Sequence, residues 1–512
     1  MNTWNYGYFT ESTYTYGYYR ELNPVFQKFC LLAKSFAAPE ANENENYCEL
    51  GFGQGVSLNI HAAANLGNFF GTDFNPAHAA HANELCSASG SGGKFFDDSF
   101  EEMLNRSDLP RFDSINLHGI WSWISTENQK IIVEFARKFL NPGGTFYNSY
   151  NCYPGWSPAA PLRELFVLHD KYAQKSKKTY ERVEEAMKFT EELLAKKPAY
   201  FGRVPDVAKI FESTRKHDHD YLAHEYFNRD WICMYFTDVV ELLEDAKLEF
   251  TCTAEVVEAL EHLSIQRDAL DFLNQIEAPV MREQVKDYFI NRQFRKDIFI
   301  RGARRISAYE RITRLMNTNY VLMSTDPLPE KFQVAVGEIS LAKDVCDKIR
   351  EHLASQNYRP KNFSEFLKKN QDISAQNIEQ ILIILVHNGN VAPCQPDAAA
   401  KLVKPKCDAL NKYFCTRAKN SGDINFMASP ITGGGITVNR FEQLFLGALA
   451  DGKKSANTIA SSIWEILSEQ GQALLQNGKR LETPEENIAQ LKDMAQDFLD
   501  KRLPILKALQ IA

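Results

Sequence analysis

Short apolar runs alternate with amphipathic stretches over the first 150 residues. The runs have the length of buried strands, and the stretches between them, such as 56–66, carry apolar or small residues at helical spacing. Strands that alternate with helices in this way predict an α/β fold with a Rossmann-like, doubly wound sheet. The predicted strands are 46–48, 68–72, 94–96, 112–117 and 145–151.

After Trp156 the pattern changes to long amphipathic helices, so we expect a domain boundary near residue 155. Between 339 and 393, three predicted helices end in the turn-forming run Asn388-Gly389-Asn390, which suggests a winged-helix-like module. The remaining chain predicts a further helical unit. The predicted helices of these regions are 159–174, 180–194, 254–263, 280–288, 342–354, a short one from 362, 374–386, 440–449, 457–475 and 484–499.

Composition fits a large soluble enzyme. The chain has 512 residues, of which 44% are hydrophobic and 24% charged, enough for several domains with cores. The amino terminus lacks a basic region followed by an apolar one and no segment approaches a membrane span, so we expect a cytoplasmic location. Ten cysteines without a C-x-x-C pair argue for reduced thiols and against a metal site. The net charge of −8, without a basic block, disfavours nucleic acid as a partner.

The segment 49–55, with the sequence ELGFGQG, lies where the first predicted strand meets the first predicted helix. Glycine lets the backbone approach a ligand closely at such a turn. Gly51, Gly53 and Gly55 miss the dinucleotide pattern G-x-G-x-x-G, because Val56 stands where the third glycine is required, and NAD is therefore disfavoured. Glu49 instead suits a cofactor that carries an ammonium and a sulfonium, which is S-adenosylmethionine.

Acidic residues follow the second and third predicted strands. Asp73 can accept hydrogen bonds from both hydroxyls of an adenosyl ribose. Asp98, followed by Ser99, is a candidate for contact with the exocyclic amine of adenine. A structural role explains Asp98 equally well, namely as the N-cap of a helix at 100–104. The predicted cofactor-binding residues are Glu49, Gly51, Gly53, Gly55, Asp73, Asp98, Ser99 and His118.

Several segments together resemble the class I S-adenosylmethionine-dependent methyltransferases that carry a methyltransferase regulatory domain. The resemblance covers nearly the whole chain. The segments of the amino-terminal part are ELGFGQG at 49–55, HGIWSW at 118–123 and SYNCYPGW at 149–156. Those of the regulatory and carboxyl-terminal parts are AHEYF at 223–227, MYF at 234–236, DYFINRQFR at 287–295, SPITG at 429–433 and ADGK at 450–453.

The best-known proteins that the chain resembles are bacterial protein-lysine methyltransferases that act on outer-membrane proteins. The resemblance therefore implies lysine as the methyl acceptor and a protein substrate. Two alternatives stay open: a small-molecule or carrier-bound acceptor, and a non-catalytic scaffold or sensor that binds the cofactor. A homodimer is also left open. The expected division is 1–155 for the cofactor-binding domain, 156–335 for a helical regulatory domain, 336–395 for the winged-helix-like module and 396–512 for a mainly helical carboxyl-terminal domain.

Direct displacement at the sulfonium methyl requires chiefly that the protein align a nucleophile and exclude water. A lysine must lose its proton first, and burial beside a positive charge favours the neutral amine. Residues at the ends of the fourth and fifth strands could orient the amine or accept a proton through water, although each has a structural alternative such as packing or bracing a turn. These candidate catalytic residues are His118, Trp121, Tyr150 and Asn151.

The first 25 residues form an arm rich in aromatic side chains. Because aromatic faces attract cations, the arm could fold over the cofactor as a lid, or it could be a packing cap on the sheet. Its aromatic residues are Trp4, Tyr6, Tyr8, Tyr14, Tyr16, Tyr18 and Tyr19.

Two further stretches attract a ligand interpretation that the sequence does not favour. The run 433–435 is Gly-Gly-Gly but lacks the lysine of a phosphate loop, so we expect a flexible turn. The arginine-rich stretch 292–305 is expected to be a solvated or intramolecular face.

Overall fold

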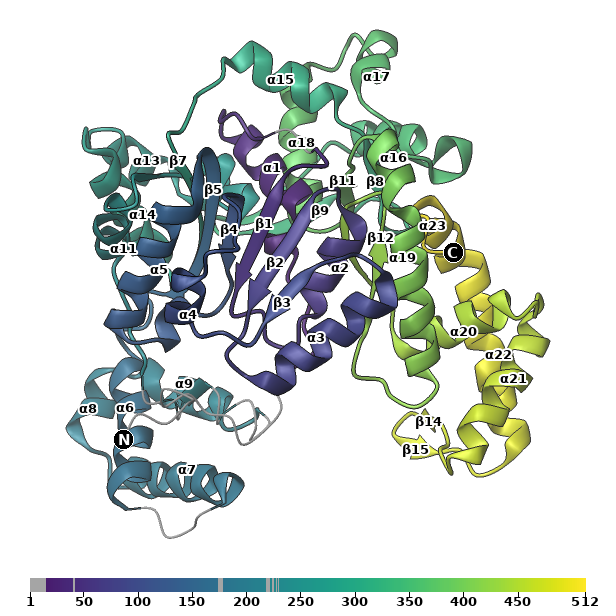
Figure 1. Ribbon diagram of the computed structural model, residues 1–512, viewed down its shortest axis with the longest axis horizontal. Coiled ribbons are helices and arrows are strands. Elements are labelled where there is room, and N and C mark those ends of the chain that lie inside the picture. Colours follow the sequence, from purple (N-terminus) through teal and green to yellow (C-terminus); the bar gives the residue numbers. More distant parts are fainter. Residues whose placement is uncertain are drawn as a thin grey trace.

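A computed structural model describes residues 15–39, 42–173, 178–217, 222, 225, 226, 228 and 230–512. Seven strands form one sheet in the order β3-β2-β1-β4-β5-β7-β6 (Figure 1). The first five strands run parallel, and β7 pairs antiparallel with both β5 and β6. This arrangement confirms the predicted α/β class with a Rossmann-like sheet. The strands are β1 Asn46–Leu50, β2 Asn68–Thr72, β3 Lys94–Phe96, β4 Phe112–Leu117, β5 Leu140–Asn151, β6 Leu248–Thr253 and β7 Phe294–Arg301.

Alternating side chains divide the sheet between two hydrophobic cores, one on each face. Tyr47 and Phe69 pack with residues of α2 and α3, whereas Cys48 and Phe70 pack with residues of α4 and α5. Helices on both faces are what a doubly wound sheet requires. The helices of this part are η1 Arg20–Leu22, α1 Pro24–Ala33, α2 Val56–Ala64, α3 Pro76–Ser89, α4 Phe100–Asn105, η2 Trp121–Trp123 and α5 Thr126–Phe139.

The last two strands of the sheet come from a region that the sequence pattern predicted as helical. The expected single helix 254–263 is divided into two short helices, η3 Val256–Ala259 and α12 Glu261–Ser264, which follow the end of β6 at Thr253. β7 was missed because buried charged residues interrupt its apolar pattern; Arg295 and Asp297 are both fully buried. The sheet is therefore completed from within residues 156–335.

Buried ion pairs fix β7 against α14 (Pro279–Ile290). The Arg295 guanidinium donates to Asp297 at 2.6 Å, to Asp287 at 2.7 Å and to Glu283 at 2.9 Å. Arg292 donates to Asp287 and also to Glu258. For these two arginines the intramolecular alternative of the sequence analysis is correct, because desolvated guanidinium groups need carboxylate partners.

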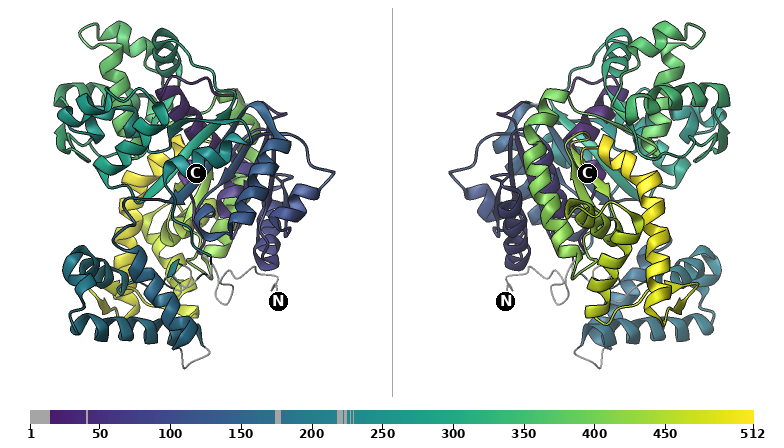
Figure 2. Two further views of the ribbon diagram at one scale, coloured as in Figure 1. Left: turned by 90° about the vertical axis from the view of Figure 1, so that its left-hand side faces the viewer. Right: turned by 90° about the vertical axis from the view of Figure 1, so that its right-hand side faces the viewer.

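A separate lobe of helices projects from the sheet and has its own small core (Figures 1 and 2). It consists of α6 Ala160–Tyr172, α7 Thr179–Ala195, α8 Ala199–Arg203 and α9 Asp206–Thr214. The segment at 223–227 lies largely outside the described residues. The elements that follow the lobe are α11 Phe236–Glu244, α13 Arg267–Leu273, α15 Ala308–Asn317, β8 Tyr320–Leu322, β9 Lys331–Val334 and β10 Gly337–Ser340.

The predicted winged-helix-like region contains three helices, and its last strand, β11, pairs antiparallel with β8. The elements are α16 Lys343–Tyr358, α17 Ser364–Lys369, α18 Ala375–His387 and β11 Val391–Pro393. The helix positions match the pattern of the sequence, while the winged-helix assignment and the domain boundaries stay predictions.

The carboxyl-terminal part packs against the helices on one face of the seven-stranded sheet rather than standing apart. Its long helix α19 lies against α2 and α3, and its hairpin β12–β13 also contacts α2 (Figure 1). The elements are α19 Asp397–Ala418, β12 Phe426–Ser429, β13 Gly434–Thr437, α20 Arg440–Ala450, α21 Ala456–Glu469, β14 Leu475–Gln476, β15 Lys479–Arg480, α22 Pro484–Asp497, the π-helical turn η4 Phe498–Arg502 and α23 Leu503–Ala508.

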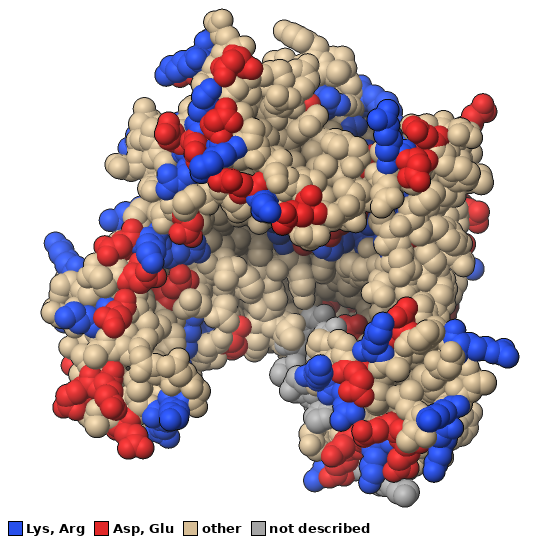
Figure 3. All heavy atoms as spheres, turned by 180° about the vertical axis from the view of Figure 1, so that it is seen from behind, with Lys and Arg blue, Asp and Glu red and all other residues tan. Residues whose placement is uncertain are grey.

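Seen from behind, acidic and basic side chains are mixed over the surface, and the molecule is hollowed between its two lower lobes (Figure 3). Among the helices described, none combines the length and apolar character needed to cross a bilayer.

Candidate active site

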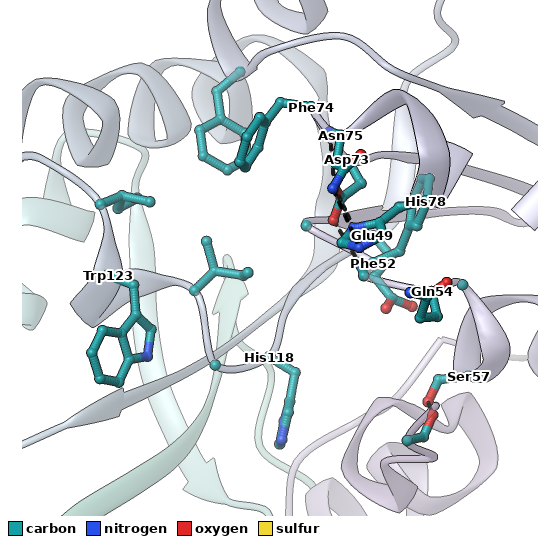
Figure 4. Close-up of a pocket in the computed structure, with 18 of the residues that line it drawn as sticks. Glu49, Phe52, Gln54, Ser57, Asp73, Phe74, Asn75, His78, His118 and Trp123 are labelled. Atoms are coloured by element: carbon teal, nitrogen blue, oxygen red, sulfur yellow. Dashed lines mark hydrogen bonds and ion pairs between the residues drawn. The ribbon is translucent and has the colours of Figure 1, made fainter. Parts of the chain in front are cut away.

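A deep pocket lies at the carboxyl ends of the parallel strands (Figure 4). Its volume is about 1300 Å³, counting the open mouth. The walls come from the glycine loop after β1, from the residues that follow β2, β3 and β4, and from the arm before η1. Ligands bind at this edge of doubly wound sheets, because the strand ends and the amino termini of helices converge there.

The glycine loop turns so tightly that it needs glycine. Gly51, Gly53 and Gly55 have positive φ angles of 77°, 56° and 71°. A Cβ atom on Gly51 would lie 2.5 Å from Ile120 Cδ1, and one on Gly55 would lie 2.6 Å from Ala82 Cβ. Glycine therefore lets the loop pack more closely on Ile120 and on α3 than a larger residue could.

Glu49 is the next-to-last residue of β1 and is only 3% exposed. Its Oε2 atom has no hydrogen-bond partner among the residues described. Burial raises the pKa of this carboxyl to about 8, although a hydrogen bond with Tyr47 acts in the opposite direction and lowers the pKa. A buried carboxyl with one unpartnered oxygen that lines a pocket can bind a cationic group of a ligand.

Asp73 follows β2 and is held in place by three contacts. Its Oδ2 accepts the Gly53 N–H at 2.8 Å, and its Oδ1 accepts the Asn75 N–H at 3.1 Å. Oδ1 also lies 3.0 Å from Nδ1 of His78. A carboxylate has about four acceptor positions, and three are used here, so Asp73 keeps about one for a ligand hydroxyl. Asn75 and His78 are not among the predicted site residues, although Asn-Pro at 75–76 is a helix-start signal that places both close to Asp73.

Asp98 and Ser99 line the same pocket from the end of β3, but their local roles differ from the predicted alternative. The N-cap of α4 is Ser99, which forms a capping box with Glu102. Asp98 instead pairs with Arg106, whose guanidinium donates to it at 2.7 Å. The alternative that Asp98 itself caps the helix is therefore wrong, since only Ser99 has its side chain next to the free N–H groups.

His118 lies after β4 between two tyrosines. Its Nδ1 is 2.9 Å from the Tyr147 hydroxyl, and its ring stacks on Tyr19 with 4.2 Å between the ring centroids. Burial lowers the pKa of His118 to about 4, so the imidazole is neutral at pH 7. The loop that follows is fixed by the Gly119 N–H, which donates to Ser149 at 2.7 Å.

The other predicted catalytic residues do not line this pocket. Trp121 is fully buried in the core beneath α5. The Tyr150 hydroxyl donates to Asp297 at 2.7 Å in the ion-pair cluster. Asn151 is 6% exposed and fixes its backbone N–H on Ser122. Since η2 turns Trp121 inward, it is Trp123 that faces the pocket (Figure 4).

The arm contributes residues that the sequence left undecided. Thr15, Gly17 and Tyr19 line the pocket, and the Tyr19 N–H donates to Ser57 Oγ at 3.0 Å. This part of the arm thus covers the pocket. The remaining predicted aromatic residues of the arm, from Trp4 to Tyr14, lie outside the described residues.

The fold and the pocket define the chain as a class I methyltransferase-type protein with a nucleotide site at the end of its sheet. Residues 218–301 match the predicted methyltransferase regulatory domain family. A protein of Synechocystis named sll1526 is 38% identical over 515 aligned positions and matches along 100% of both chains. The Rickettsia prowazekii protein RP789 is 24% identical over 269 residues, 50% of this chain and 46% of that protein.

Among solved structures, PKMT2 from Rickettsia typhi in complex with AdoHcy shares the fold. The TM-score is 0.69 at 20% identity, over 98% of this chain and 100% of that one. The chain belongs to the family of class I S-adenosylmethionine-dependent methyltransferases that carry a methyltransferase regulatory domain. The resemblance given by the sequence segments is thereby confirmed.

The pocket residues fit the cofactor of this family. Glu49 offers a buried carboxyl, whose Oε2 has no partner among the described residues, for the ammonium of a methionine moiety, and the glycine loop lies beside it. Asp73 stands at the end of the neighbouring strand, where a ribose binds in such sheets. All eight predicted cofactor-binding residues line this one pocket.

Proposed function

We propose that this protein transfers the methyl group of S-adenosylmethionine to lysine side chains of a protein substrate. The observation that carries the proposal is the pair of carboxylates at adjacent strand ends of one pocket, Glu49 and Asp73, with the glycine loop between them. The choice of lysine is supported by the sequence resemblance and by the fold shared with PKMT2 along nearly the entire chain. The resemblance also favours an outer-membrane protein as the substrate.

Four residues bind different parts of S-adenosylmethionine in this proposal. Glu49 pairs with the ammonium, Asp73 accepts a hydrogen bond from a ribose hydroxyl, and Asp98 with Ser99 borders the adenine. When bound, S-adenosylmethionine supplies an electrophilic methyl group on a sulfonium. The amine nitrogen of the acceptor forms the new bond to that methyl carbon, while the carbon–sulfur electron pair stays with sulfur and gives a neutral thioether.

His118 is neutral at pH 7, so it can accept a hydrogen bond from the incoming amine and orient its lone pair. With a pKa of about 4 it is too weak a base to remove the ammonium proton. That proton leaves to solvent before the amine enters, because a desolvated site beside a sulfonium disfavours the ammonium form. Tyr19 and Trp123 border the same space and keep water from the reacting atoms.

The test is incubation of the purified protein with methyl-labelled cofactor and a host-cell extract, followed by separation of proteins from metabolites. Label on proteins, lost when lysines are blocked beforehand and located on lysine by mass spectrometry, supports the proposal. Label confined to small molecules would replace the lysine acceptor with a metabolite. Binding of AdoHcy without any transfer would favour the non-catalytic scaffold. The variant Glu49→Gln serves as the control for label incorporated by other enzymes in the extract.

A further inference from the structure

Residues 15–19, the described part of the arm before η1, form an extended segment that we call the strap. Its residues face alternately the pocket and the carboxyl-terminal part of the chain. Thr15, Gly17 and Tyr19 face the pocket. Tyr16 and Tyr18 face the other way, toward the carboxyl-terminal part of the chain. This alternation follows from extended backbone, in which successive side chains point to opposite sides. One short segment therefore joins the cofactor pocket to a region more than 400 residues away in sequence.

Tyr18 is seated on the hairpin β12–β13. A Cβ atom on Gly435 would lie 2.7 Å from the Tyr18 ring, and one on Gly434 would clash with the Asn23 side-chain amide and with the Tyr18 hydroxyl. Neither glycine has a positive φ angle, so close approach of Tyr18, joined by Asn23 at Gly434, and not a turn, requires glycine here. The tyrosine ring also packs 5.6 Å from the ring of Phe426 in β12. Gly434 and Gly435 therefore lie in a strand and form the contact surface for Tyr18, which we call its seat. The flexible turn expected from the sequence is wrong for these two residues.

The hairpin is itself anchored to the helix that starts at the glycine loop. Asn65, the C-cap of α2, donates from its side chain to the Gly433 carbonyl at 2.6 Å. Asn23, just before α1, donates to the Thr432 carbonyl at 3.1 Å. The Tyr18 hydroxyl lies 3.3 Å from Nε2 of His61 in the same α2. The seat is thus held in a fixed position relative to the pocket.

On the pocket side, the strap is held by two contacts that depend on where Tyr18 sits. The Tyr19 N–H donates to Ser57 in the first turn of α2. The Tyr19 ring stacks on His118 at an interplanar angle of 28°. A shift of Tyr18 from its seat would move its neighbour Tyr19, because a chain bond joins them.

We infer that the hairpin β12–β13 is a positioning element of the cofactor pocket, in which Gly434 and Gly435 seat Tyr18 and thereby hold Gly17 and Tyr19 across the bound cofactor. The carboxyl-terminal part of the chain controls cofactor affinity through this strap. The inference rests on the proposed function for the identity of the ligand only. The seating of the strap is a property of the free protein.

The experiment compares Gly435→Ala with Gly447→Ala. The first adds a methyl group against the Tyr18 ring, whereas the second adds one in α20 of the same region, where the nearest atom is Cys415 Cβ at 3.9 Å. Hydrogen exchange at the Tyr19 amide measures the strap in the free protein, and calorimetry with AdoHcy measures affinity. We expect Gly435→Ala to speed exchange at residues 17–19 and to weaken AdoHcy binding about tenfold. Gly447→Ala is expected to match the wild type in both.

A second variant, Tyr18→Ala, keeps the test decisive if Gly435→Ala does not fold. It removes the seated ring without adding atoms, and faster exchange at Tyr19 is again expected. Unchanged Tyr19 exchange in a folded Tyr18→Ala or Gly435→Ala protein would overturn the inference, as would faster exchange with unchanged AdoHcy affinity. Failure of the wild type to bind AdoHcy would instead count against the proposed function, while the exchange data would still report on the seat.

Discussion

The ring of Tyr19 stacks on His118, with 4.2 Å between centroids and 28° between planes, so that the arm closes on the residue that follows β4. The contact joins the two sides of the pocket, because Tyr19 precedes the first helix and His118 follows the fourth strand. Tyr147 lies on the other side, with its ring 4° from parallel to that of His118. The imidazole is thus enclosed by aromatic groups and kept neutral.

The first prediction concerns this stack. Tyr19→Ala should weaken AdoHcy binding about tenfold and lower methyl transfer, since it removes both the stacked ring and the cover over the pocket. Tyr19→Phe keeps the ring and should bind as the wild type does. Calorimetry and a transfer assay measure the two effects. Equal losses in both variants would mean that the hydroxyl, not the stacked ring, is responsible.

The second prediction concerns the proton on Glu49. In the free protein the carboxyl holds a proton below its pKa of about 8, and pairing with a ligand ammonium should lower that pKa. AdoHcy binding should therefore release a proton, and its affinity should rise with pH between about 6 and 7.5, where an α-amino group is still protonated. Calorimetry in buffers of different ionisation enthalpy counts the protons released.

Glu49→Gln provides the control for this release. The variant should bind AdoHcy about 10- to 100-fold more weakly and without the proton release. It should also change the stability of the free protein. Because the raised pKa means that the folded state binds more protons than the unfolded state, the free energy of unfolding of the wild type falls as pH rises from about 4.5 to 8. Glu49→Gln should flatten that slope, and an unchanged slope would argue against the buried carboxyl.

The third prediction separates the two tryptophans of the HGIWSW segment. Trp121→Ala should destabilise the fold by about 3–5 kcal/mol, because it empties a fully buried core position. Trp123→Ala should leave the melting transition nearly unchanged and lower methyl transfer, because Trp123 lines the pocket. Thermal unfolding and a transfer assay on both proteins test this. The reverse pattern would restore Trp121 as the residue that acts on substrate.

The fourth prediction concerns the buried arginine of the regulatory segment. Arg295→Ala should destabilise the protein by about 3–5 kcal/mol, since it leaves three buried carboxylates without their shared cation. Arg314→Ala removes an arginine from a half-exposed pair with Glu310 on α15 and should cost no more than about 0.5 kcal/mol. Denaturant unfolding compares the two. Similar small losses would show that the cluster contributes specificity of packing rather than stability.

The cofactor-binding residues of the site could be predicted from local sequence. The predicted cofactor-binding residues follow four consecutive strands: the glycine loop, Asp73, Asp98 with Ser99, and His118. In an alternating α/β chain the strands are parallel, so their carboxyl ends meet at one edge of the sheet. The catalytic candidates were less predictable. Trp121, Tyr150 and Asn151 also stand near strand ends, but side-chain direction at the end of a strand or in a short turn depends on the packing around it.

The sequence by itself determined the first five strands, the strand-end residues of the pocket and the family, because each of these is written in short-range periodicity and in motifs at fixed spacing. Only the tertiary structure decided that β6 and β7 complete the sheet. The apolar pattern of β7 is interrupted by Arg295 and Asp297, and Arg295 is neutralised by packing against Glu283 and Asp287 of α14. The tertiary structure also decided that Trp123 replaces Trp121 at the pocket and that Tyr18 sits on Gly434 and Gly435. Contacts between distant segments depend on how whole layers pack, and no local pattern encodes that packing.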